Sequence, residues 1–135
     1  MTLAELSKDI KQCMTDWHKV SPPNSPLSYL YLYRKTQALN HFNARQATNH
    51  LLLTALDQLK ESYEKEADVL ERRYLDMVSV NELSNEMNIA DSTLYVLQRT
   101  AFAHLAEIIE TMEGELSRQQ KSTLLDRLDA PSYVN

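Results

Sequence analysis

Between positions 92 and 99 the chain carries the side chains best suited to contact a nucleic acid. Gln98 and Arg99 are of the types that hydrogen-bond adenine and guanine edges in pairs. A helix that begins at Ser92 and turns its apolar residues towards a core would expose most of this stretch. The predicted DNA contacts are Ser92, Thr93, Tyr95, Val96, Gln98 and Arg99, and the predicted phosphate contacts are Arg72, Arg73, Arg118 and Lys121.

Elsewhere the chain lacks the residue patterns of a catalytic or metal site. Its histidines, at positions 18, 41, 50 and 104, show no paired spacing with Cys, Asp or Glu that would build a zinc site. Having one glycine excludes a Gly-rich loop that cradles phosphates. Cys13 lies on an apolar helix face, which predicts a buried, unreactive thiol. We therefore expect no enzymatic activity, cofactor, metal or small-molecule substrate.

The residues around positions 92–99 have the pattern of two helices joined by a tight turn. Ser79 and Glu82 form a capping-box pattern, which predicts the start of a short helix. Asn88 tolerates the left-handed conformation that ends a helix, and residues 91–93 can all cap the next one. The apolar positions of the two helices are Val80, Leu83 and Met87, followed by Leu94, Leu97, Ala101, Leu105, Ile108 and Ile109. This layout places a helix in the DNA major groove in helix-turn-helix proteins, but compact helical domains also contain such pairs for packing alone.

Helix-start signals divide the first half of the chain. Thr2 and Glu5 form a capping box before an amphipathic helix. Three prolines, at positions 22, 23 and 26, make residues 21–25 a rigid loop, and Ser25 is expected to start a second helix that runs to residue 38. Asn43 caps a third helix, whose apolar stripe through residues 47–63 we expect at the centre of the core.

The second half is expected to contain a helix over residues 67–75, then the helix pair, then a last helix. Gly114 is expected to break or bend the long helix that starts at Ser92. The last helix is expected to end near residues 130–131, where Pro131 cannot continue it.

Composition predicts an all-α fold. The 135 residues are the size of one domain, and one glycine is far below the usual share of about 7%. We expect a multi-helix bundle with an N-terminal helix (1–20), a helical scaffold (25–63), a helix-turn-helix region (64–112) and a C-terminal helix and tail (113–135). One cysteine allows no internal disulfide, which favours a cytoplasmic protein. The longest uncharged apolar run, residues 51–56, is too short for a membrane span.

The net charge of −5 opposes a simple DNA-binding interpretation. Affinity for duplex DNA comes largely from Lys and Arg side chains that replace counterions at phosphates. If the protein binds DNA, we expect weak binding by a monomer, or avidity from linked copies.

Two resemblances add to this interpretation. Residues 70–76 (LERRYLD) followed by SVNELSNEMNIADSTLYVLQRTAFAHLAEII resemble the last DNA-binding region of bacterial sigma factors. This similarity implies a sigma-like helix-turn-helix, although sigma-like readers usually carry basic or amide side chains where Tyr95 and Val96 stand. The wider order of Asn24-Ser25-Pro26-Leu27, Ala47-Thr48-Asn49, LERRYLD and Leu128-Asp129-Ala130-Pro131-Ser132-Tyr133 is similar to bacterial N-terminal domains that precede NB-ARC/STAND-type signalling ATPases.

Two functions follow as hypotheses. The first is a DNA-binding domain of a bacterial transcription or signalling regulator, with double-stranded DNA as the partner. The second is a protein interaction or oligomerisation module that keeps the helix-turn-helix scaffold and contacts another copy or an attached ATPase module. Exposed Tyr95 and Val96 favour the second, and retention of the whole scaffold favours the first.

Overall fold

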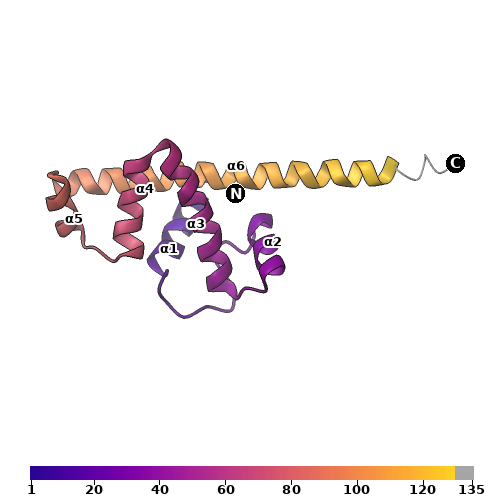
Figure 1. The fold of residues 1–135 in the computed structure, drawn as a ribbon, viewed down its shortest axis with the longest axis horizontal. Helices are drawn as coiled ribbons and strands as arrows, with labels where there is room; N and C mark the ends of the chain where they lie inside the picture. Colours follow the sequence, from indigo (N-terminus) through magenta and orange to yellow (C-terminus); the bar gives the residue numbers. More distant parts are fainter. Residues whose placement is uncertain (130–135) are drawn as a thin grey trace.

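One long helix, α6 (Asp91–Asp129), runs the length of the molecule in the computed structural model, which describes residues 1–129 (Figure 1). The other helices are α1 (Leu3–Thr15), α2 (Tyr31–Asn40), α3 (Ala44–Ser62), α4 (Glu64–Leu70) and α5 (Val80–Met87), with a π-helical turn η1 (Glu71–Leu75) after α4. All of them lie along the N-terminal part of α6, and its C-terminal end projects past them (Figure 1). The described residues contain no strand, so the predicted all-α multi-helix bundle is confirmed.

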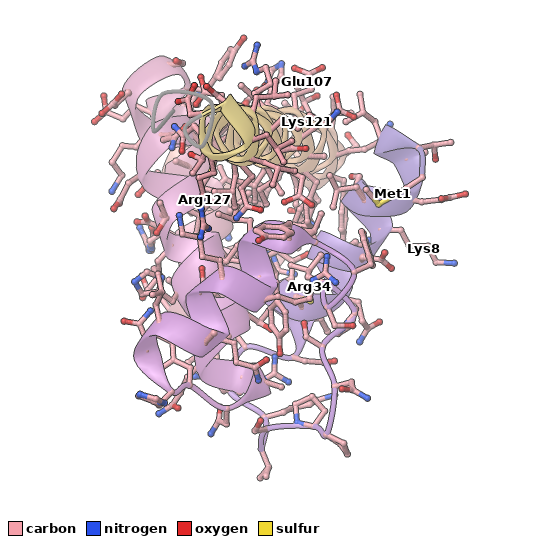
Figure 2. The ribbon with its side chains drawn as sticks, turned by 90° about the vertical axis from the view of Figure 1, so that its right-hand side faces the viewer. Met1, Lys8, Arg34, Glu107, Lys121 and Arg127 are labelled. Atoms are coloured by element: carbon pink, nitrogen blue, oxygen red, sulfur yellow. The ribbon has the colours of Figure 1, made fainter. Side chains whose placement is uncertain are left out.

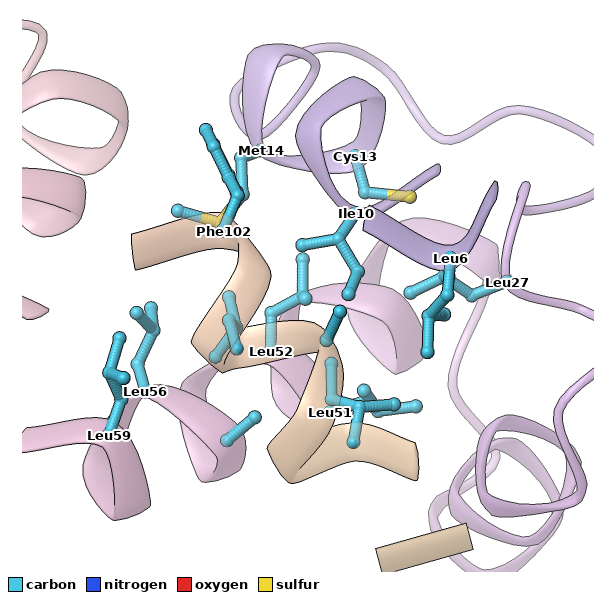
Figure 3. Packing of buried hydrophobic residues seen from close by; sticks show 14 of the residues in the cluster. Leu6, Ile10, Cys13, Met14, Leu27, Leu51, Leu52, Leu56, Leu59 and Phe102 are labelled. Atoms are coloured by element: carbon cyan, nitrogen blue, oxygen red, sulfur yellow. The ribbon is translucent and has the colours of Figure 1, made fainter. Parts of the chain in front are cut away.

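The main hydrophobic core joins α1, α3 and α6, with contributions from α2 and α4 (Figure 3). The predicted stripe of α3 supplies its centre, because Leu51, Leu52, Leu56 and Leu59 are all fully buried. Tyr63 ends that stripe differently: it is 44% exposed and stacks on the ring of His104. The apolar period of α3 therefore sets the core, as expected for an amphipathic helix.

The helix caps predicted from the sequence form hydrogen bonds at the starts of three helices. Thr2 with Glu5 and Asn43 with Gln46 both form complete capping boxes, at the starts of α1 and α3. At the start of α5, the Ser79 hydroxyl accepts the Glu82 N–H at 3.1 Å, although no return bond from the Glu82 side chain forms among the described residues. These helix starts need only residues within one turn, which explains why the sequence predicts them.

Helix α2 starts later than predicted. Residues 25–30 form turns, in which the buried Ser25 hydroxyl accepts the Leu27 N–H at 3.1 Å. The first two N–H groups of α2 instead meet a carboxylate from α6, because Tyr31 and Leu32 donate to Glu113 at 2.7 and 2.8 Å. A cap supplied from another helix thus fixes the start of α2.

The predicted break at Gly114 is wrong. Helix α6 continues through it, across the boundary expected at residue 113, to Asp129. One glycine within a helix costs only about 1 kcal/mol relative to alanine, and the residues on both sides favour the helix. The helix end expected near residues 130–131 lies outside the described residues.

No helix within residues 1–129 is long and apolar enough to cross a membrane.

Candidate nucleic-acid interface

Helices α5 and α6 meet through a short turn that has its own packing. Asn88 ends α5 in the left-handed conformation, with φ 55° and ψ 44°, as predicted. Val69, Leu83 and Leu94 form a small buried cluster, and Ile89 packs against it. A small hydrophobic cluster, separate from the main core, therefore holds α5 against the start of α6.

A polar contact closes the same corner. The buried Ser84 hydroxyl donates to the Asp91 carboxylate at the start of α6. Asp91 thereby joins the two helices, and its negative charge lies at the N-terminus of α6, where the helix dipole favours it.

The exposed face at the start of α6 carries five of the six predicted DNA contacts: Ser92, Thr93, Tyr95, Val96 and Arg99. Tyr95 and Val96 are each 51% exposed. Gln98 is the exception, because it is only 6% exposed and its Oε1 accepts from Arg73 Nε at 3.2 Å. It lies one turn after Leu94 on the buried side of the helix, where it lines the same groove as Tyr95 and Arg99 but leaves little of its side chain free to contact a base as predicted.

Two predicted phosphate contacts are engaged within the protein. Arg72 Nη2 bonds Glu86 at 2.7 Å, which raises the pKa of the Arg72 guanidinium above its ordinary value. Arg73 donates to the Val78 carbonyl at 2.8 Å as well as to Gln98. Both arginines tie η1 to the helix pair rather than present a free charge to a phosphate.

The other two predicted phosphate contacts, Arg118 and Lys121, are exposed but distant. They follow Arg99 by about 30 Å along α6, from a rise of about 1.5 Å per residue. They do not belong to the same contact surface.

The structure instead places two lysines of α1 beside Arg99. A groove of about 460 Å³ lies between α1 and the start of α6, and Lys8, Lys11, Tyr95, Arg99 and Phe102 all line it. Lys8 projects from α1 away from the bundle (Figure 2). Sequence reasoning missed both lysines, since nothing local connects α1 to α6.

The two acidic residues of α1 are both engaged within the protein. Asp9 accepts a hydrogen bond from Tyr29 at 2.9 Å, and Glu5 accepts the Thr2 N–H at 3.3 Å, whereas Lys8 and Lys11 line the groove with Ala4 and Ser7. The net negative charge of the chain is thus not spread evenly, and this groove brings three cationic side chains together.

A second polar cluster joins α4 to α6. His104 Nδ1 lies 2.6 Å from Glu66 Oε2, and Tyr63 stacks on the imidazole with ring centroids 4.0 Å apart. Among residues 1–129 no group of three or more His, Cys, Asp or Glu side chains is arranged to hold a metal ion. Cys13 is 1% exposed, and burial raises the pKa of its thiol to about 11, so the thiol is protonated at neutral pH.

No protein-family model, curated protein or solved structure matches this chain.

Proposed function

We propose that this protein binds double-stranded DNA through the start of α6 and the neighbouring face of α1. The observation that carries this proposal is the groove in which Lys8 and Lys11 lie beside Arg99 and Tyr95. The B-DNA major groove admits an α-helix, and side chains near the start of that helix contact base edges. The resemblance to sigma-factor helix-turn-helix regions supports the same orientation.

The two lysines would supply the phosphate contacts in place of Arg72 and Arg73. Each neutralised phosphate releases condensed counterions, which is the main source of affinity for duplex DNA. Arg99 and Tyr95 would then face the groove, with Arg99 able to bond guanine. Three cations give modest affinity, which agrees with an acidic chain that needs linked copies for tight binding.

A second candidate function is contact with a partner protein, including the ATPase module that the wider resemblance implies. Tyr95 and Val96 favour it, because each leaves about half of its surface in solvent near the start of α6. This function needs no phosphate contacts.

Fluorescence anisotropy of labelled duplex DNA separates the two. We expect the double variant Lys8→Ala/Lys11→Ala to weaken binding about tenfold or more at low salt. The matched control is Arg34→Ala/Lys35→Ala, which removes the same charge from exposed positions of α2, a helix that contributes no residue to the lining of the groove.

Arg99→Ala is expected to weaken binding by about 1–3 kcal/mol and to relax specificity at one base position. Equal losses in the groove variant and the control would refute the groove as the binding site. A flat titration of the wild type up to about 100 μM would favour the partner-protein function.

A further inference from the structure

We propose that an exposed face of α6 pairs antiparallel with the same helix of a second copy of this protein. The face consists of Glu107, Glu110, Gly114, Ser117, Lys121 and Leu124, and every one of them is exposed. Their spacing alternates between three and four residues, which is the seam spacing of paired helices. Figure 2 shows Glu107 on the side of α6 away from the bundle. Ser117, Lys121 and Leu124 lie on the flank of α6 that borders α2, where they line an open groove with Tyr31 and Lys35.

Gly114 is the first observation that points to a close neighbour. It is the only glycine in the chain and lies inside a helix, where glycine is among the least favourable residues. No atom of residues 1–129 lies within 4 Å of the position that a Cβ would occupy, so packing within this part of the chain does not require a glycine. A second helix crossing at Gly114 and the small Ser117 would require one, because small residues let two backbones approach closely.

The exposed leucines after Ser117 are the second observation. Leu124, Leu125 and Leu128 are 58%, 61% and 65% exposed, on the part of α6 that projects past the other helices (Figure 1). Leu116 is the last buried residue of the described chain. Leu124 and Leu128 continue the three- and four-residue spacing of the face, and leucines exposed on a helix beyond the core are typical of a helix that has a partner.

The distribution of charge along this face of α6 favours a second copy of the chain as the partner and an antiparallel arrangement of the two helices. The seam is acidic before Gly114, at Glu107 and Glu110, and basic after it, at Lys121. If Ser117 faces Gly114 of the partner subunit in an antiparallel pair, Lys121 faces Glu110 of the partner subunit, and symmetry repeats this contact. A parallel pair would place like charges opposite each other, so a second copy fits this face only in the antiparallel direction.

This pairing goes beyond the proposed DNA contact and does not rest on it. In this register Leu128 faces Ala103 of the partner subunit, so the paired segment ends one turn before Arg99. The face used for pairing and the groove beside Lys8 and Lys11 are therefore separate, and two copies could supply the avidity that a weakly binding domain needs.

The test is sedimentation equilibrium of the full chain without DNA, which makes its outcome independent of the proposed function. We expect a dimer to form at concentrations on the order of 100 μM. The single variants Glu110→Lys and Lys121→Glu should each weaken the dimer at least about tenfold, because each creates two like-charge contacts.

Two combinations should restore it. A chain carrying both Glu110→Lys and Lys121→Glu should form a homodimer again, and an equal mixture of the two single variants should form a heterodimer. Gly114→Leu should give a monomer that keeps its helical circular dichroism, since a Cβ added at this exposed position meets no other atom of residues 1–129 within 4 Å.

The matched controls are Glu115→Lys, an exposed charge outside the seam, and Tyr95→Glu/Val96→Glu, outside the paired segment; both should still dimerise. A wild type that stays monomeric to about 1 mM would overturn the proposal, as would a Gly114→Leu dimer. Failure of the double charge exchange to restore the dimer would overturn the antiparallel register.

Discussion

Glu113 of α6 holds the start of α2, and its removal should destabilise the whole fold. Its two carboxylate oxygens accept the Tyr31 and Leu32 N–H groups at 2.7 and 2.8 Å, and α2 has no side-chain cap of its own. A hydrogen bond to a charged group contributes about 1.5–3 kcal/mol, and Tyr31 is exposed, so we take the lower part of the range. Because two such bonds are lost, Glu113→Ala should lower the free energy of unfolding by about 3–4 kcal/mol.

Urea unfolding followed by circular dichroism measures this loss, and amide exchange at Tyr31 and Leu32 locates it. Glu113→Gln keeps one acceptor but places an NH₂ group opposite the second N–H, so it should lose at least half as much. Glu115→Ala, at an exposed position two residues away, is the control and should change stability by less than about 0.5 kcal/mol. A Glu113→Ala variant as stable as this control, with unchanged exchange at both amides, would refute the capping role.

Three further changes test other parts of the fold. Met77 is 73% exposed with φ 60°, so Met77→Gly should raise the free energy of unfolding by about 1 kcal/mol in the same urea assay. Ser79→Ala removes the cap of α5 and should cost about 1 kcal/mol, with faster amide exchange at Glu82. Burial raises the pKa of the Cys13 thiol from 9.0 to about 11. The unfolded chain therefore loses this proton at a lower pH than the folded protein does. The free energy of unfolding should fall by roughly 2–3 kcal/mol as the pH rises from about 9 to 11. Urea unfolding at pH 8.5 and at pH 10.5 should show this loss in the wild type and not in Cys13→Ala.

Local patterns predicted the elements that depend on neighbouring residues. The caps at Thr2 and Asn43, the buried stripe of α3 and the left-handed Asn88 each follow from side chains within one or two turns. Gly114 shows the limit of such signals, because a single unfavourable residue lowers helix stability without ending a helix that is anchored on both sides.

The candidate site depended on contacts between distant segments. Gln98 is predicted to contact DNA, but it lies one helical turn after the buried Leu94. Its side chain is therefore turned towards Arg73, whose Nε donates a hydrogen bond to it. Lys8 and Lys11 carry no signal in α1 beyond a shared helix face, and only the packing of α1 against α6 brings them to Arg99. The start of α2 likewise depends on Glu113, 82 residues from Tyr31 in the sequence.

The most direct test of DNA binding at this groove is the salt dependence of duplex affinity for the wild type and for Lys8→Ala/Lys11→Ala. The two lysine contacts to phosphate predict a slope of log K against log salt of about −1.8, and loss of both predicts a slope near zero. Equal slopes for the two proteins, or no binding by the wild type at low salt up to about 100 μM, would contradict the proposed interface.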